Sequence, residues 1–174
     1  MPWPRRLLTG YHGTVGPYAD DIRDNGIQLA KCSLESDFGR GFYTTRILGQ
    51  AIEFANERFR QMTKDHARHP SVYPDPQHAA VLEFSIVLDA LGSLETLAFV
   101  QPTDDWLDFI GYCRIPGGST HKANANYFDA VYGPVWRSGA DAHPSWEQLS
   151  FHNDYPVRTL LTLEVPILRG GPEL

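Results

Sequence analysis

A glycine-rich stretch in the first third of the chain has residue types suited to holding a ligand. It reads Asp37-Phe38-Gly39-Arg40-Gly41-Phe42-Tyr43-Thr44-Thr45. Gly39 and Gly41 let the backbone turn sharply and approach a ligand with no Cβ in the way. Phe42 and Tyr43 follow in a strand-forming run and point to opposite faces, so one can enter the core while the other faces a cleft.

Two distant stretches carry further polar and aromatic side chains of the kind found in sites. One is Tyr11-His12-Gly13-Thr14, and the other is Trp146-Glu147-Gln148-Leu149-Ser150-Phe151-His152. Each is common on its own, and only together with the glycine-rich stretch do they suggest a site. Three further histidines, at 66, 69 and 78, lack the compact pairing of a structural zinc site and have no cysteine nearby. We therefore expect no metal.

The familiar nucleotide and hydrolase motifs are absent from the sequence. There is no Walker-type loop, no H-E-x-x-H and no G-x-S-x-G. The G-x-G at Gly39–Gly41 lacks the third glycine of a dinucleotide fingerprint, and the acidic partner expected about twenty residues later would fall inside a predicted helix. A Rossmann fold is therefore disfavoured.

The elements that must position these residues alternate irregularly along the chain. A long helix is predicted at 46–64, with Thr45 as N-cap and Ile47, Ala51, Phe54, Ala55, Phe59 and Met62 on its inward face. Shorter helices are predicted at 18–25, after Thr103 and near 155–161. Strands are predicted at 5–11, 81–88, 127–135, 147–152 and 162–168, with a loop at 136–146. This order lacks regular βαβ repeats and predicts an α+β fold.

Size and composition limit the possible functions. With 174 residues, 42% of them hydrophobic, the chain is expected to form one domain over residues 1–168, followed by a flexible tail at 169–174. The net charge of −6 argues against a broad basic face for non-specific duplex binding. Two cysteines make no disulfide framework, and no apolar run approaches membrane-spanning length. A soluble cytoplasmic protein without membrane contact is expected.

The three stretches, in this order and spacing, resemble the NAD-binding half of ADP-ribosyltransferases. The resemblance is to the branch with a His–Tyr–Glu triad, which includes diphtheria toxin and the poly(ADP-ribose) polymerases. It covers most of residues 10–55 and 127–152. The chain is more similar still to a bacterial domain family of poorly defined function within that superfamily, whose members carry a Phe-Asp-x-Val-x-Gly-Pro strand like 128–134 and a Gln-[Ile/Leu]-x-Phe strand like 148–151. The resemblance implies a split mixed β-sheet core with flanking helices.

The resemblance also implies roles for individual residues. His12 would bind a ribose hydroxyl of NAD, and Gly13, followed by Thr14, would offer its backbone groups to the nicotinamide amide. Tyr43, beside Phe42, would stack on the nicotinamide ring, and Phe54 would supply a second aromatic. Arg40 could contact an NAD phosphate or remain in solvent. In place of the serine with which the polymerases bind the amide, the sequence has Ala51.

Glu147 is the expected catalytic carboxylate, acting with Tyr43 and His12. An anion there can bind the ribose 2′-hydroxyl and face the positive charge that develops as nicotinamide leaves. A shift of one residue in strand register would bring the neutral Gln148 into the site instead. The loop 136–146 would then form the wall that recognises the acceptor.

The function implied is NAD-dependent transfer of ADP-ribose to a macromolecule, either protein or nucleic acid, with release of nicotinamide. A small bacterial enzyme of this kind could act as an intracellular toxin with a neutralising antitoxin protein. Hydrolysis of NAD and non-catalytic binding of NAD or ADP-ribose are the alternatives. Gln148 in the site would favour the binding module. The sequence does not identify the acceptor or the oligomeric state.

Overall fold

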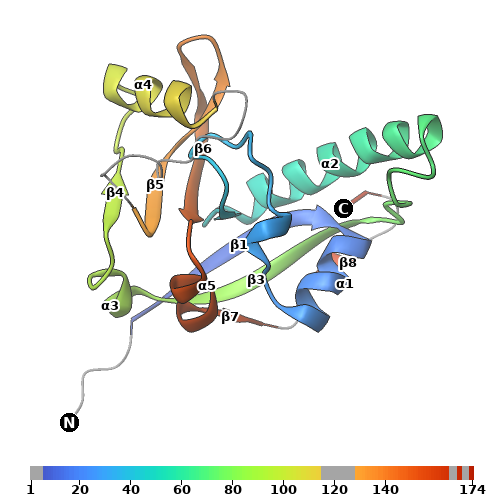
Figure 1. Cartoon of the computed structure of the whole chain (residues 1–174), viewed down its shortest axis with the longest axis horizontal. Coiled ribbons are helices and arrows are strands. Elements are labelled where there is room, and N and C mark those ends of the chain that lie inside the picture. Colours follow the sequence, from blue (N-terminus) through green and yellow to red (C-terminus); the bar gives the residue numbers. More distant parts are fainter. Residues whose placement is uncertain (1–5, 115–127, 165–167, 170–172) are drawn as a thin grey trace. The chain divides into compact units, whose positions relative to one another are not determined.

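A computed structural model of the chain describes residues 6–114, 128–164, 168–169 and 173–174 (Figure 1). In chain order the elements are β1 (Leu7–Val15), α1 (Gly16–Asn25), a 3₁₀ helix (Leu29–Lys31), β2 (Phe42–Thr44), α2 (Leu48–Arg68), β3 (Ala79–Val87), α3 (Leu88–Leu91), β4 (Thr96–Ala98), α4 (Asp104–Cys113), β5 (Ala130–Ser138), β6 (Asp141–Phe151), α5 (Asp154–Leu160), β7 (Leu161–Leu163) and β8 (Leu168–Arg169). The predicted α+β class is confirmed. None of the described helices is long and apolar enough to cross a membrane.

The described chain forms two compact units, each built on one sheet. Unit 1 consists of residues 6–8, 27–43, 86–114 and 128–161, and unit 2 consists of the other described residues. The sheet of unit 1 has the order β2-β6-β5-β4 and is mixed, because β4 runs parallel to β5 while β6 runs antiparallel to it. The sheet of unit 2 has the order β1-β3-β7, with β8 antiparallel to β3.

Helix α2 of unit 2 confirms the predicted long helix and corrects its orientation. The helix begins at Leu48, so its N-cap is Ile47 and not Thr45 as predicted; the hydroxyl of Thr45 accepts a hydrogen bond from the backbone N–H of Ile47, just before the helix. Ala51, Ala55 and Met62 are buried, as the spacing predicts. Two predicted inward residues are not, because 41% of Ile47 and 50% of Phe54 is exposed. The buried stripe of α2 is therefore narrower than its apolar periodicity suggests.

The described end of the chain packs against the same helix. The backbone N–H of Leu174 donates to Asn56 Oδ1 over 2.7 Å, and the amide of Asn56 donates back to the Leu174 carbonyl. Arg60 forms an ion pair with Glu173 at 2.8 Å. Residues 170–172 of the predicted tail lie outside the described residues.

Unit 1 is dominated by the β5–β6 hairpin, and here the predicted loop at 136–146 is wrong. Strand β5 continues to Ser138, and β6 begins at Asp141, so most of that loop is paired strand. Gly139 makes the tight connection with a positive φ of 55°, which glycine adopts without strain. The register shifts between Pro134 and Trp136 and again before Ser138, which marks bulges in β5.

A core cluster lies on one side of this hairpin. It contains Phe38, Trp106, Ile110 and Val131, each at most 2% exposed. Helix α4 supplies two of these side chains. Its start confirms the prediction, because the side chain of Thr103 accepts a hydrogen bond from the backbone N–H of Trp106.

Candidate functional site

The expected site residues of unit 2 lie on β1 and α2. Gly13 of β1 lies against the backbone of α2. A Cβ built at Gly13 would lie 2.3 Å from the carbonyl oxygen of Ala51 and 3.0 Å from the backbone nitrogen of Ala55. Glycine is therefore required here for packing, whatever ligand the backbone of β1 contacts. The neighbouring Thr14 is buried and His12 is half-buried.

Phe54 lies on the exposed side of α2. Half of its surface is accessible, while the adjacent Ala55 is fully buried. The prediction that Phe54 lies one helical step inward is wrong, because β1 approaches α2 at the small residues Ala51 and Ala55 while Phe54 is exposed. The exposed aromatic ring remains available for stacking on a planar ligand.

In unit 1 the glycine-rich stretch forms a tight loop before β2. Gly39 has a φ of 81°, a backbone conformation that few other residues adopt readily. A Cβ at Gly41 would lie 2.7 Å from Nδ1 of His152, so this glycine makes room for the histidine ring. The same Nδ1 lies 2.9 Å from the carbonyl oxygen of Arg40. Nε of Arg40 is buried and has no hydrogen-bond partner among the described residues, so it is a donor that a ligand could use.

Tyr43, a residue of β2, binds the backbone of this loop through its hydroxyl group. Its hydroxyl donates to the carbonyl oxygen of Gly39 over 2.7 Å and accepts from the backbone N–H of Phe38 at 2.9 Å. Burial raises the pKa of Tyr43 well above its usual value, so the phenol stays neutral at physiological pH. The Tyr43 ring meets the ring of His152 edge to face. The preceding residue, Phe42, is buried.

A buried carboxylate, Asp37, joins the start of this loop to the hairpin. Its Oδ1 accepts from Nη1 of Arg114 at 2.8 Å. Its Oδ2 accepts from the backbone N–H of Trp136 and from the side-chain amide of Gln148, each also at 2.8 Å. Gln148 donates in addition to the carbonyl oxygen of Pro134 at 3.1 Å. The side chain of Gln148 is thus held within the packed interior of unit 1.

Glu147 faces the other way. Successive residues of a strand point to opposite faces, and Glu147 pairs with Pro134 whereas Gln148 pairs with Gly133. A Cβ at Gly133 would clash with Phe38, which places the Gln148 side of the strands against the core cluster.

A cavity of about 470 Å³ in unit 1 is lined by Glu147; its other charged and aromatic lining residues are Phe99, Tyr132, Asp141, His143 and Trp146. The rings of His143 and Trp146 stack with centroids 4.1 Å apart and planes 24° from parallel. Nδ1 of His143 is buried without a hydrogen-bond partner among the described residues. We call this cavity the Glu147 pocket.

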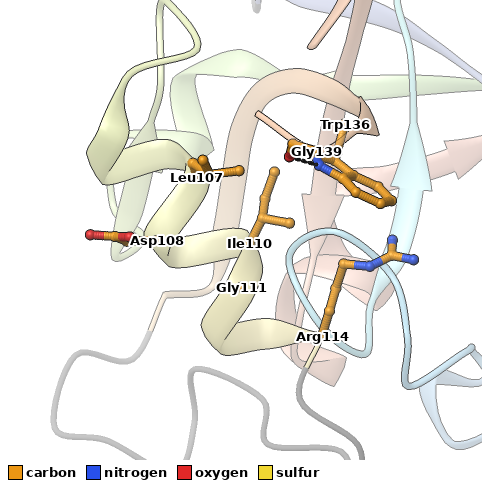
Figure 2. Close-up of a pocket in the computed structure, with 7 residues that line it drawn as sticks. All are labelled: Leu107, Asp108, Ile110, Gly111, Arg114, Trp136 and Gly139. Atoms are coloured by element: carbon orange, nitrogen blue, oxygen red, sulfur yellow. Dashed lines mark hydrogen bonds between the residues drawn. The ribbon is translucent and has the colours of Figure 1, made fainter. Parts of the chain in front are cut away.

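A second cavity in unit 1, of about 520 Å³, lies between α4 and the hairpin (Figure 2). Arg114 reaches along it, with its guanidinium carbon 4.7 Å from the centre of the Trp136 ring. The indole N–H of Trp136 donates to the carbonyl oxygen of Gly139. Because Arg114 is already paired with Asp37 and Asp108 lines the same cavity, this cavity offers little net attraction for an anion.

Sequence reasoning missed Asp37, His143 and Trp146 as parts of these arrangements. Asp37 and Trp146 each begin one of the stretches that were singled out, but nothing local reveals their contacts. The partners of Asp37 lie 77 to 111 positions away along the chain. His143 and Trp146 lie only three residues apart on β6, but residues at that spacing in a regular strand point to opposite faces, so the strand pattern does not predict that their rings stack.

The family described as "Protein of unknown function (DUF3990)" matches residues 11–154. The chain belongs to this family. The matched span contains all expected site residues of this DUF3990 member, from His12 on β1 to Gln148 on β6. No curated protein matches the chain.

Proposed function

We propose that this DUF3990 member is an NAD-dependent ADP-ribosyltransferase that releases nicotinamide and transfers ADP-ribose to a macromolecule. The observation that carries the proposal is that Glu147 and Gln148 lie on opposite faces of β6. Gln148 is held by Asp37 and Pro134, whereas Glu147 lines a cavity beside aromatic rings. Of this pair, Glu147 is the residue that lines a cavity, and it is the carboxylate that the resemblance to the His–Tyr–Glu branch assigns to catalysis.

The chemistry needs few groups, because NAD already carries a cationic leaving group. When the bond between C1′ of the ribose and the nicotinamide nitrogen breaks, its electron pair neutralises the nicotinamide ring and positive charge develops on the ribose. Glu147 would hold the 2′-hydroxyl and stabilise that charge. A preorganised group of this kind contributes about 10²–10³ in rate.

Two further contacts are expected from unit 1. Tyr43 would stack on the nicotinamide ring. Arg40 would donate to a phosphate through its Nε–H, which has no hydrogen-bond partner among the described residues.

Nicotinamide release from NAD tests the proposal. It should be measured for the wild type, Glu147→Gln and Gln148→Ala, with and without bacterial lysate as a source of acceptors. We expect release that depends on lysate, that falls by about 10²–10³ in Glu147→Gln, and that persists in the folded fraction of Gln148→Ala.

The other outcomes separate the alternatives. Release that is equally fast without lysate would identify an NAD glycohydrolase instead. Calorimetric binding of NAD without any release would identify a binding module. Neither binding nor release, by a protein shown to be folded, would refute an NAD-dependent function.

A further inference from the structure

Strand β4 forms one edge of the unit 1 sheet. It is the last strand in the order β2-β6-β5-β4, and among the described strands it pairs with β5 alone (Figure 1). The pairing extends beyond β4 itself. The carbonyl oxygen of Glu95 accepts from the backbone N–H of Asp129 at 2.7 Å, and the backbone N–H of Phe99 donates to the carbonyl oxygen of Tyr132 over 2.8 Å. An extended segment from 95 to 99 therefore borders the sheet.

The backbone of this segment has hydrogen-bonding groups on its outer side. In a strand, the N–H and C=O of one residue point to one side, and those of the next residue point to the other side. Glu95 and Phe99 direct theirs at β5, so Thr96 and Ala98 direct theirs outward. Among the described residues no backbone group pairs with them there. Such an edge is a template for one more strand.

The side chains along the edge leave it open to pairing. Natural sheets protect an edge with lysine, proline or a bulge, and the segment 95–100 contains neither lysine nor proline. Thr96 and Val100 are β-branched and exposed, and 85% of Val100 is accessible. On the opposite face, Leu97 and Phe99 are only half-buried against the core cluster. An added strand would cover apolar surface on both faces.

The sequence around β4 is acidic. From 86 to 113 it contains neither lysine nor arginine, and its carboxylates are Asp89, Glu95, Asp104, Asp105 and Asp108. Asp89 pairs with Arg6, whereas the other four form no ion pair among the described residues. A positively charged segment would be attracted to this edge. A second copy of the chain would bring the same negative charges, so repulsion opposes pairing between two copies.

We propose that the outer edge of β4 binds a basic segment of a partner protein by strand addition. The segment becomes the next strand of the unit 1 sheet. Hydrogen bonds from its backbone to Thr96 and Ala98 provide affinity, and the carboxylates of Glu95, Asp104 and Asp105 select lysine or arginine side chains. This surface goes beyond the proposed function, because its use requires neither NAD nor Glu147.

NMR of the full-length chain with synthetic peptides tests the proposal. The probe is an octapeptide of alternating lysine and valine. One control peptide has glutamate in place of lysine, so it keeps the strand propensity and reverses the charge. A second control is the lysine–valine peptide with every backbone nitrogen methylated, so it keeps the charge and loses the hydrogen-bond donors.

We expect the lysine–valine peptide to bind at least about 10-fold more tightly than the glutamate peptide. It should also slow hydrogen exchange at the backbone amides of Thr96 and Ala98, because these N–H groups become hydrogen-bonded. The methylated peptide should not slow this exchange. Binding that leaves both amides unprotected, or equal binding of the lysine and glutamate peptides, would overturn the proposal.

Two substitutions at position 98 test the role of the backbone. Ala98→Pro removes the outward N–H, and an edge strand tolerates proline where that N–H faces solvent. We expect it to weaken binding of the lysine–valine peptide by about 5-fold, the effect of one lost hydrogen bond. Ala98→Thr keeps the N–H and should bind as the wild type does. The backbone amide spectrum reports whether each variant is folded, and equal binding by two folded variants would contradict the proposal.

Two pairs of substitutions test the role of charge. Asp104→Asn combined with Asp105→Asn should weaken binding by about 3-fold, since each exposed ion pair contributes little. Glu53→Gln combined with Glu57→Gln removes the same charge from exposed positions of α2 and should have no such effect. Equal effects of the two pairs would mean that only net charge matters, and the proposal would fail.

Two further results are decisive. Protection of Thr96 and Ala98 that appears without peptide and grows with protein concentration would assign the edge to a second copy and overturn the proposal. Glu147→Gln should bind the lysine–valine peptide as tightly as the wild type does. Loss of nicotinamide release and loss of peptide binding are therefore separate outcomes, and either proposal can fail while the other stands.

Discussion

The side-chain amide of Gln148 donates a hydrogen bond to Oδ2 of Asp37 over 2.8 Å, although the two residues are 111 positions apart. This contact ties the loop that precedes β2 to strand β6. It also fixes which face of β6 is occupied by the amide, because a slip of one residue would send Gln148 to the other face. The orientation of Glu147 therefore depends on a residue far away in the sequence.

Removing the Asp37 carboxylate should destabilise unit 1. In Asp37→Ala, three buried or half-buried donors, from Arg114, Trp136 and Gln148, lose their acceptor. We expect a loss of about 3 kcal/mol in the free energy of unfolding, since a hydrogen bond to a charged group contributes about 1.5–3 kcal/mol and part is recovered by relaxation. Urea denaturation monitored by tryptophan fluorescence measures it.

The matched control for Asp37→Ala is Asp105→Ala, because Asp105 is an exposed residue in the first turn of α4. Its loss should cost no more than about 1 kcal/mol of favourable interaction with the helix N-terminus. Equal effects of the two substitutions would show that the Asp37 network contributes nothing to stability.

The packing of β1 on α2 gives a second prediction. Gly13→Ala places a Cβ 2.3 Å from the Ala51 carbonyl oxygen, and that oxygen belongs to the helix backbone, so it cannot turn away. We expect a destabilisation of about 2–3 kcal/mol, comparable to other overpacking substitutions. Gly49→Ala is the control on the same helix, because nothing lies within 4 Å of its Cβ position.

Gly49→Ala should be neutral or stabilising by up to about 1 kcal/mol, from the higher helix propensity of alanine. Thermal unfolding of the two variants beside the wild type compares them. A Gly13→Ala variant as stable as Gly49→Ala would mean that β1 and α2 do not approach as closely as described.

Alkaline pH gives a third prediction. The pKa of Tyr43 is raised well above 10.0, mainly by burial, and that of Cys32 is raised from 9.0 to about 11 by the same cause. In the unfolded chain both groups deprotonate at lower pH than in the folded protein. Folding stability should therefore be unaffected by these groups below about pH 9 and should decline as the pH rises through 9 to 11.

The variants Cys32→Ser and Tyr43→Phe separate the two contributions. Cys32→Ser should flatten the decline between pH 9 and 11, and Tyr43→Phe should flatten it above pH 10. Tyr43→Phe should also lose about 1–2 kcal/mol at neutral pH, because its hydroxyl bonds to Gly39 and Phe38 disappear. The test is to measure urea midpoints at several pH values. If the stability of both variants declined with pH as steeply as that of the wild type, the prediction would be contradicted.

Local patterns predicted much of the fold because they depend on neighbours in sequence. The stripe of Ala51, Ala55 and Met62 marked α2, and Thr103 marked the start of α4. Both strands of the hairpin were predicted, but their extension through 136–146 was missed because Gly139 and Pro144 are turn-forming residues, and paired strands with bulges can contain such residues. Phe54 was misplaced because its apolar character says nothing about how closely β1 approaches the helix.

The candidate site was predictable only as a set of residue types. The choice between Glu147 and Gln148 could not be made from sequence, because it depends on strand register. That register involves Asp37, whose partners lie at the C-cap of α4, in β5 and in β6 and are brought together only by the fold. Long-range contacts of this kind leave no periodic trace in the sequence.

Two single substitutions on β6 give a fourth prediction: one adds a negative charge at position 148, and the other removes the negative charge at position 147. Gln148→Glu places a carboxylate where the amide now donates to Asp37 and Pro134, so two donors are lost and two carboxylates face each other. We expect a destabilisation of about 3 kcal/mol at pH 7. Glu147→Gln changes the same number of charges on the opposite face and should alter stability by less than about 1 kcal/mol, while lowering the proposed release of nicotinamide by about 10²–10³.

The pH dependence of Gln148→Glu makes this prediction specific. Repulsion by Asp37 should raise the pKa of the introduced carboxyl in the folded protein above its unfolded value of about 4.3. A raised pKa means that the stability is present below about pH 4 and is lost as the pH rises through the folded pKa. The stability of Gln148→Glu relative to Gln148→Ala should therefore improve on acidification, whereas Glu147→Gln should show no such recovery relative to Glu147→Ala. A pH-independent difference between Gln148→Glu and Gln148→Ala would place residue 148 away from Asp37, and with it would reverse the assignment of Glu147 to the cavity.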